Sequence, residues 1–286
     1  MKNQSLELIT TYNAETSLKK PQKLISTTLK EFIGAKDLAW RLFLRDISAQ
    51  YRQSFLGIFW AFFPPIITSL IFIFLQTRNV ITIADTKVPY PVYVLIGTTL
   101  WQIFSDSLNA PLKTTINAKP YLVKIYFPRE SLILASFFGV LFNALIKMLI
   151  IIGVLIFFKV QINFGVLLAP FAILVLILLG IFIGTLITPL GMLYSDVSTS
   201  LPIIIQLLFF ATPVVYSFPD KFPFSLLNLI NPISPVLIAA RNLLTIGNIE
   251  NITHFLAIAI LTPIGFFFSL IFFRISLPII IEKLGT

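Results

Sequence analysis

The stretch of the sequence best suited to contacting a partner is a short basic interruption between two long hydrophobic segments, residues 117–130. It contains Lys119, Lys124 and Arg129 beside Glu130, and it is broken by two prolines. Charges of this kind bind a partner through ion pairs and charge-assisted hydrogen bonds. Basic residues in a short loop also favour the cytosolic side of a membrane. We therefore predict that this loop faces the cytosol and docks a partner.

Several kinds of chemistry are excluded by composition. The chain has no cysteine and one histidine, which excludes disulfides and thiolate chemistry and leaves no ordinary zinc site. We interpret His254 as a polar residue at a helix end. No glycine is followed by lysine, so the nucleotide-binding P-loop is absent, and there is no Asp-x-Asp metal motif of a glycosyltransferase. The sequence predicts a protein that is not an enzyme and takes its energy from a partner.

Two charged residues lie inside hydrophobic segments, and an intramembrane charge is expensive enough to indicate function. Counting about 1.5 Å per residue puts Lys147 roughly 24 Å from the cytosolic edge of its segment and Asp106 roughly 22 Å below the outer edge of the preceding one. At these depths we expect no pairing. Lys147 then either reaches toward the outer interface or contacts substrate. Asp106 belongs to a polar face that we expect to look inward, with Gln102, Ser105, Ser107 and Asn109.

The elements that position these residues follow from composition. Hydrophobic residues make up 57% and charged residues 12% of the 286 residues, and the mean hydropathy is +0.94. One soluble core could not bury so much apolar surface, so we predict an all-α membrane protein. A helix needs about twenty apolar residues to cross a bilayer. Six segments meet this length: 55–76, 91–110, 131–158, 166–190, 200–216 and 254–274.

Charge asymmetry sets the expected topology. The formal net charge of +9 is spread between the hydrophobic segments, so we assign it to lipid headgroups and predict no nucleic-acid partner. Most basic residues precede the first segment, occupy the second loop or follow the last segment, which predicts cytosolic termini. We also expect no signal peptide. The predicted divisions are a cytosolic tail over 1–35, an interfacial amphipathic helix over 36–54 and a six-span domain over 55–286.

The segment before the first span has the periodicity of a helix lying in the membrane interface. Its apolar residues recur at helical spacing beside a parallel polar stripe. The apolar residues are Trp40, Leu44, Ile47 and Tyr51, and the polar stripe is Arg41, Arg45, Ser48 and Arg52. Further apolar residues fall on a third face. A helix held between lipid and a cytosolic partner and a plain interfacial anchor both fit this pattern.

Prolines and glycines mark three further features. Pro64 and Pro65 must kink or unwind the first span. Several prolines divide residues 217–253 into apolar runs too short to cross the bilayer, which predicts two re-entrant half-helices on the outer side. Gly180 and Gly184 form a GxxxG motif, which we expect to pack helices inside one subunit rather than to mark a dimer seam.

Three motifs in fixed order carry a family resemblance over roughly residues 36–280. In chain order they are Tyr51-Arg52 with Ser54, Leu56, Gly57 and Trp60, then Leu122-Val123-Lys124 with Phe127-Pro128-Arg129-Glu130, and last Thr212-Pro213-Val214-Val215-Tyr216 with Asn231-Pro232 and Arg241. This set resembles the permease subunits of polysaccharide-exporting ABC transporters. One departure is Tyr194-Ser195-Asp196, where the family has an arginine between tyrosine and aspartate. Asp196 is therefore open to three readings, a solvated carboxylate, a helix cap or a partner contact.

The resemblance implies a homodimer with two separate ABC ATPase subunits. Those subunits would bind ATP and Mg, and this chain would carry no cofactor. The implied substrate is a lipid-linked glycan, such as the O-antigen of lipopolysaccharide, capsule or teichoic acid, moved across the bacterial plasma (inner) membrane. A cytosolic coupling helix is expected between spans 2 and 3. The residues expected to couple to the ATPase are Arg41, Arg45, Arg52, Lys119, Tyr121, Lys124, Arg129 and Glu130.

Aromatic rings are the candidates for the substrate path, since flat rings contact sugar rings without strong directional hold. The channel-lining candidates flank the irregular segments: Phe59, Phe62, Phe63, Phe209 and Phe210. Packing within the membrane core is the other explanation for these rings. The outer-gate candidates are Pro213, Tyr216, Asn231 and Arg241. Two alternatives remain open, an ABC exporter of a drug or simple lipid and a membrane-embedded glycan-synthesis protein.

Overall fold

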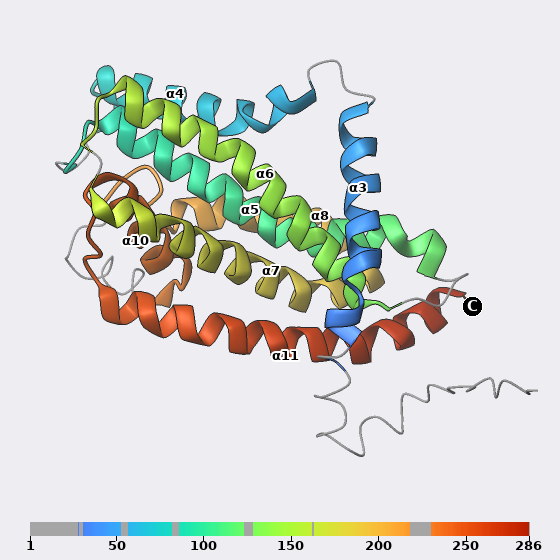
Figure 1. The fold of residues 1–286 in the computed structure, drawn as a ribbon. Helices are drawn as coiled ribbons and strands as arrows, with labels where there is room; N and C mark the ends of the chain where they lie inside the picture. Colours follow the sequence, from blue (N-terminus) through green and yellow to red (C-terminus); the bar gives the residue numbers. More distant parts are fainter. Residues whose placement is uncertain are drawn as a thin grey trace, which may run out of the picture.

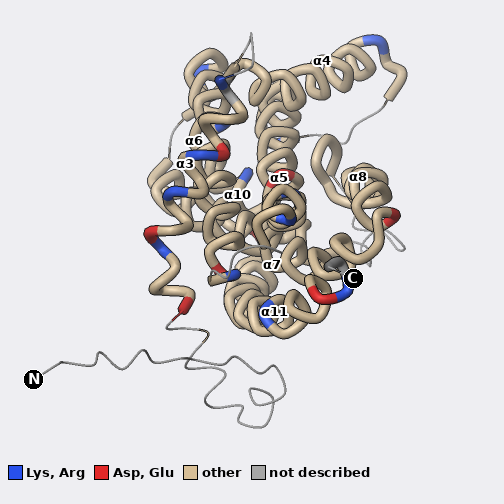
Figure 2. The backbone as a smooth tube through the Cα atoms, turned by 90° about the vertical axis from the view of Figure 1, so that its right-hand side faces the viewer, with Lys and Arg blue, Asp and Glu red and all other residues tan. Residues whose placement is uncertain are grey.

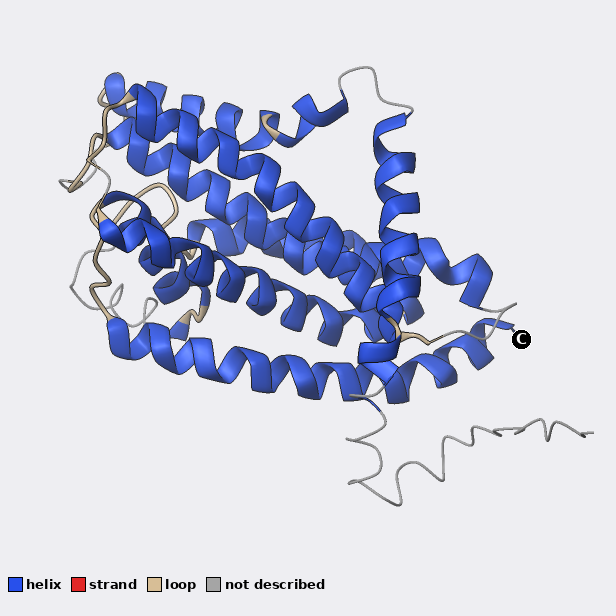
Figure 3. Ribbon diagram, in the orientation of Figure 1, coloured by secondary structure: helices blue, strands red, loops and turns tan. Residues whose placement is uncertain are grey.

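The computed structural model describes residues 28, 31–52, 57–81, 86–122, 128–161, 163–217 and 230–285. Every regular element in these ranges is a helix (Figure 3). This agrees with the predicted all-α fold. In chain order the elements are α3 (Lys36–Arg52), η1 (Gly57–Ala61), α4 (Phe63–Thr77), α5 (Tyr90–Leu122), α6 (Glu130–Phe157), η2 (Phe164–Leu168), α7 (Ala169–Leu193), α8 (Ser195–Phe210), α10 (Ile233–Thr245) and α11 (Ile252–Gly285).

The long helices run along one common direction, and α3 runs across them at one end (Figure 1). We name this end, where the C-terminus also lies, the α3 end. The short helix α10 lies at the opposite end, which we name the α10 end (Figure 1). At the α10 end, the connection before α5 is tied to the start of α11 by an ion pair between Lys87 and Glu250 with an N–O distance of 2.5 Å.

Three helices are long and apolar enough to cross a membrane by length and composition: Glu130–Phe157, Phe164–Leu193 and Ile252–Lys283. The helix α5 is also long, with 33 residues, but it carries the polar face predicted around Asp106. The apolar helices α4, α8 and α10 are shorter, at 10–17 residues each. The described part of the chain is therefore an integral membrane bundle of long and short helices.

The helix boundaries differ from several predicted segments: α8 ends at Phe210 rather than at residue 216, and α11 continues to Gly285 rather than ending at residue 274. Two further differences affect the candidate site. The second segment was expected to end at residue 110, but α5 continues to Leu122, so residues 117–122 of the expected loop are helical. The polar residues in this part of the sequence suggested a loop. A helix can also continue into water beyond the membrane, and α5 continues through these residues. The first segment is broken rather than continuous, because η1 ends and α4 begins around Phe62. The proline pair opens α4 in its first turn, where a missing backbone N–H leaves no helical bond unmade.

Of the two half-helices predicted between α8 and α11, the structure describes one, α10. Any second one would fall in residues 218–229, which lie outside the described residues. With 13 residues, α10 extends only about 20 Å, which is too short to span a bilayer. The backbone N–H of Ile233 donates to the side-chain oxygen of Asn231 at 3.0 Å, which fixes the start of α10.

The core of the bundle is the contact between α5 and α7. Gly180 and Gly184 let α7 approach α5 closely, because a Cβ on Gly184 would lie 2.2 Å from the carbonyl oxygen of Leu108 and one on Gly180 would lie 2.5 Å from the Cβ of Ser107. Gly191 extends this contact against Leu112. The GxxxG motif therefore packs two helices of one subunit, which confirms the prediction.

The crossing helix α3 packs on α6 through small and aromatic residues. Ala39 and Phe43 are buried against α6, and the Phe43 ring lies 6.1 Å from the rings of both Phe138 and Phe142. The apolar stripe predicted from periodicity is divided, since Trp40 is 51% exposed and Leu44 is 45% exposed, while the Trp40 ring still lies 5.8 Å from that of Phe138 and Ile47 is partly buried against the same cluster. The helix is thus attached to the bundle by one face, and part of its predicted apolar stripe also contacts that bundle.

Candidate functional site

The α3 end brings together several of the predicted coupling residues. Arg45 of α3 stacks over the ring of Tyr121 at the end of α5, with the guanidinium carbon 5.4 Å from the ring centre, and its NH2 group donates to Asp46 at 2.8 Å. Both Arg45 and Tyr121 are exposed. The other exposed residues of the predicted set at this end are Arg41, Arg52 and Lys119. Figure 2 views this end and shows charged residues spread along α3 and near the C-terminus.

The remaining coupling candidates are placed differently. Arg129 is half-buried at the start of α6, and Lys124 lies outside the described residues. Glu130 is only 2% exposed, so its carboxylate does not form part of the outer surface. It faces Arg274 of α11 with an N–O distance of 3.3 Å. Glu130 can therefore act on a docked partner only through the residues that it contacts inside the bundle.

Arg274 joins three separate parts of the chain. Its NH2 group pairs with Glu31, just before α3, at 2.8 Å, and its NH1 group faces Glu130 and donates to Thr28 at 3.3 Å. In the sequence, Arg274 counted only among the basic residues that follow the last hydrophobic segment, and its contacts were not predicted, because its partners lie far away in the sequence. The network links Glu130 at the start of α6 to the segment before α3 and to α11.

At the α10 end, a buried arginine holds the turn that follows α8. Arg241 of α10 is 2% exposed and donates to the carbonyl oxygens of Pro213 and Val214 at 2.9 and 2.6 Å. Its guanidinium carbon also lies 3.8 Å from the ring centre of Tyr93 on α5, and a cation over an aromatic face is attracted by the ring quadrupole. The structure thus brings two outer-gate candidates, Pro213 and Arg241, into direct contact.

The other two gate candidates belong to the same cluster. Asn231 donates to the carbonyl oxygen of Ala211 at 3.0 Å and to Thr212 at 2.8 Å. The hydroxyl of Tyr216 donates to the carbonyl oxygen of Phe210, and the backbone oxygen of Tyr216 accepts from Tyr93 at 3.1 Å. Residues 211–216 are therefore fixed from several sides.

Sequence analysis did not identify the face of α5 that receives this turn. Tyr90, Tyr93 and Gly97 recur at helical spacing, and the hydroxyl of Tyr90 donates to the carbonyl oxygen of Val215 at 3.1 Å. A Cβ on Gly97 would lie 2.2 Å from the carbonyl oxygen of Val214 and 2.5 Å from a guanidinium nitrogen of Arg241. The spacing of two tyrosines and a glycine is the signal that could have indicated this contact. We name Tyr93, Gly97, residues 211–216, Asn231 and Arg241 the outer clamp.

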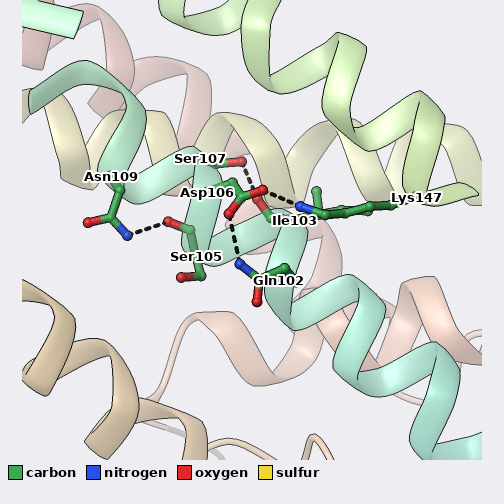
Figure 4. Close-up of polar contacts among 7 residues, drawn as sticks. All are labelled: Gln102, Ile103, Ser105, Asp106, Ser107, Asn109 and Lys147. Atoms are coloured by element: carbon green, nitrogen blue, oxygen red, sulfur yellow. Dashed lines mark hydrogen bonds and ion pairs between the residues drawn. The ribbon is translucent and has the colours of Figure 1, made fainter. Parts of the chain in front are cut away.

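The expectation that Lys147 and Asp106 lie at different depths is wrong. Lys147 of α6 donates to Asp106 of α5, as Figure 4 shows, and the Lys147 side chain is only 4% exposed. The error arose because the second segment was expected to end at residue 110, whereas α5 ends at Leu122. Counted from Leu122, Asp106 lies about 24 Å along α5, and counted from Glu130, Lys147 lies about 26 Å along α6, so the two side chains meet. Lys147 does not reach toward the outer interface.

The predicted channel residues fall into two groups. Phe209 is half-buried and packs edge-on against Trp101 of α5, with ring centres 5.7 Å apart. Phe59, Phe63 and Phe210 are exposed at 65%, 43% and 56%. Phe62 is half-buried at the junction of η1 and α4. The exposed rings are available to a substrate or to lipid, whereas Phe209 also stabilises the contact between α8 and α5.

These features define a helical membrane protein with an exposed basic surface at one end and a tightly held turn at the other. Residues 37–245 match the family described as ABC-2 type transporter. The chain belongs to this family.

Two curated relatives extend the comparison. An "O-antigen export system permease protein RfbA" of Myxococcus xanthus is 24% identical over 208 residues, which cover 71% of this chain and 78% of that protein. A protein of the same name from Klebsiella pneumoniae is 23% identical over 233 residues, covering 77% of this chain and 86% of that protein. This chain is similar to both over most of their length.

Proposed function

We propose that this chain is the membrane permease of an ATP-driven ABC exporter that moves a lipid-linked polysaccharide of the O-antigen type across the bacterial plasma membrane. The observation that carries the proposal is the match to two relatives of the same name, each aligned over more than two thirds of both chains. An exporter of drugs or simple lipids would belong to the same family, but neither of these relatives is named as one.

The proposal includes a topology. The α3 end carries the exposed basic residues Arg41, Arg45, Arg52 and Lys119, together with Lys283 near the C-terminus. Because basic residues accumulate on the cytosolic side, this charge supports a cytosolic α3 end and an outer α10 end. Six crossings then place both termini in the cytosol, and α10 returns on the outer side without crossing. The interfacial position of α3 at the cytosolic surface follows from its direction across the bundle (Figure 1).

The partners follow from the missing energy source. The sequence has no P-loop, so two ABC ATPase subunits with bound ATP and Mg would drive transport through a homodimer of this chain. The ATPase would dock on the exposed surface formed by Arg45, Tyr121 and the adjoining loop. The network that joins the buried Glu130 to the half-buried Arg274 and Glu31 would carry the resulting movement to α11 and to the segment before α3. The outer clamp would hold the exit side during this movement.

Deletion of the gene in its native host tests the proposed function. We expect the cell-surface polysaccharide to disappear and its lipid-linked form to accumulate on the cytosolic side. Surface polysaccharide is detected on intact cells, and the lipid-linked pool is measured in extracts. The wild-type gene on a plasmid should restore the surface polymer. Normal surface polysaccharide in the deletion strain, or a defect limited to drug resistance, would contradict the proposal.

A further inference from the structure

The middle of α5 carries a row of polar side chains that the proposed function leaves without a role. Gln102, Ser105, Asp106 and Asn109 lie at helical spacing on one face of α5, and all four are half-buried. We name these residues the α5 polar stripe. Asp106 is sixteen residues from each end of α5. The stripe is therefore central in the bundle, far from the aqueous ends.

A lipid environment does not suit this surface. Hydrocarbon offers no hydrogen bonds, so polar side chains exposed to lipid carry a large desolvation penalty. The surface of α6 at the same depth shows the contrast, because Leu145 and Leu149, on either side of Lys147, are 62% and 60% exposed and apolar. The chain thus places an apolar surface beside a polar one at one membrane depth. The polar surface must face something that forms hydrogen bonds.

The contacts of the stripe define the chemistry of its ligand. Lys147 neutralises Asp106 from the buried side, while the Asp106 side chain remains 31% exposed. Gln102 donates to the second carboxylate oxygen at 2.8 Å, and the side chain of Asn109 donates to the carbonyl oxygen of Ser105 at 2.9 Å. The side-chain oxygens of Gln102 and Asn109 and the hydroxyl of Ser105 are directed away from these contacts (Figure 4).

The stripe is consequently close to neutral and offers both donors and acceptors. A site for an anion would show excess positive charge, and a site for a cation would show a carboxylate without its own lysine. Hydroxyl groups match the stripe best, because each hydroxyl both donates and accepts. A sugar chain presents hydroxyls along its whole length and can move from one partner to the next.

We propose that the α5 polar stripe lines the path of the polysaccharide and hydrogen-bonds the hydroxyls of its passing sugar units. Lys147 is a positioning residue, which holds the Asp106 side chain in place from the buried side without touching the sugar. This inference rests on the proposed function, and it names the surface that the glycan contacts at the centre of the membrane. The carboxylate of Asp106, fixed by Lys147 and Gln102, is the strongest acceptor on the path.

Cysteine accessibility tests the lining role. The chain has no cysteine, so Gln102→Cys, Ser105→Cys and Asn109→Cys each introduce a single thiol. Membranes with the assembled transporter are treated with a charged, water-soluble methanethiosulfonate. We expect reaction about tenfold faster or more than at Leu145→Cys and Leu149→Cys, since the reactive thiolate forms only where water reaches. Equal rates at stripe and control positions would overturn the proposal.

Two further outcomes separate the sugar from other occupants. The same labelling is compared in host cells that make the lipid-linked polysaccharide and in cells blocked in its synthesis. Slower labelling in the producing cells supports the proposal, and unchanged labelling overturns the sugar contact. Rapid disulfide formation between two copies of the Ser105→Cys chain, without reagent labelling, would show that the stripe packs against a second copy, which also overturns it. These results do not depend on the phenotype of the gene deletion.

Transport by apolar variants gives an independent measurement. The double variant Gln102→Leu/Asn109→Leu keeps similar volume and removes two polar groups. Export should fall about tenfold, because each lost hydrogen bond to the sugar weakens its contact with the path. Leu149→Met serves as the control on the lipid-facing surface and should export normally. Wild-type export by the double variant, at equal amounts of protein in the membrane, would contradict the proposal. If the double variant is not inserted, the cysteine labelling decides the question.

Discussion

Two arginines lie at opposite ends of the bundle, Arg241 buried and Arg274 half-buried, and they are held in different ways. Arg241, at the α10 end, donates to two backbone carbonyl oxygens and lies over an aromatic ring. Arg274, at the α3 end, pairs with the carboxylates of Glu31 and Glu130. The first set of partners is neutral and belongs mainly to the backbone. The second set is charged and sits on side chains from separate elements.

From this difference between the partners of the two arginines we predict which end of the bundle can move. Backbone carbonyls of a tight turn can change partners only if the turn itself unfolds, and Gly97 leaves no free space behind Arg241. Side-chain carboxylates can exchange or lengthen their ion pairs while their helices shift. We therefore expect the α10 end to keep one geometry. At the α3 end one arginine connects three parts of the chain, and we expect these parts to shift together when a partner docks there.

The largest effect is expected from breaking the charged network. In Arg274→Met, Glu130 is left buried without its positive partner, which costs about 3–5 kcal/mol because an unpaired charge stays in a low-dielectric site. We expect a strongly lowered melting temperature of the detergent-purified permease and little assembled complex. Adding Glu130→Gln to this variant should recover much of the stability while ATP hydrolysis stays uncoupled from export. Recovery of full coupling in the double variant would show that the network is only structural.

Breaking the outer clamp should have the next largest effect. Gly97→Ala forces a Cβ against the carbonyl oxygen of Val214 and the guanidinium of Arg241. Overpacking of this kind costs about 1–3 kcal/mol, and we expect lower thermal stability together with reduced export. Gly139→Ala on α6 is a matched control, because a Cβ there meets nothing within 4 Å. If both variants melt like the wild type, the clamp is not tightly packed.

A charge reversal at the α3 surface should separate coupling from stability. Arg45 is exposed and pairs with its neighbour Asp46, so Arg45→Glu should change stability by no more than about 0.5 kcal/mol. We expect the purified complex to keep ATP hydrolysis but to lose most export, and Lys124→Glu should act in the same way. Arg78→Glu, an exposed reversal at the α10 end, should leave coupling intact. If coupling stays normal in both Arg45→Glu and Lys124→Glu, these residues only anchor the chain at the membrane surface.

The smallest effects are expected in the aromatic candidates. Phe59→Leu, Phe63→Leu and Phe210→Leu keep the surface apolar but remove the ring, so export should fall by about two- to fivefold each if the rings contact sugar. Phe268→Leu, 64% exposed on α11, is the control for a ring facing lipid. Phe209→Leu should also lower thermal stability, since that ring packs on Trp101. If the three exposed candidate variants export as well as the Phe268→Leu control, these rings serve only to pack against lipid and neighbouring helices.

The sequence predicted what depends on local pattern and missed what depends on distant contacts. Hydrophobic length and composition indicated an all-α membrane protein, and the GxxxG motif indicated close packing of α7 inside one subunit. The four outer-gate residues were identified from their order in the chain, and the structure brings them together. The pairing of Lys147 with Asp106 was missed because it depends on where α5 ends. Arg274 was missed because its carboxylate partners are more than one hundred residues away.

Site-specific photocrosslinking tests the central claim most directly, namely that the α3 end receives an ABC ATPase in the cytosol. A photoreactive amino acid is placed at Lys119 or Tyr121, at the α3 end, and at Lys87 or Glu250, at the α10 end, all exposed positions. After illumination of intact cells, we expect the α3-end positions to crosslink to the ATPase subunit and the α10-end positions not to. An ATPase crosslink from Lys87 or Glu250, with none from Lys119 or Tyr121, would contradict the account.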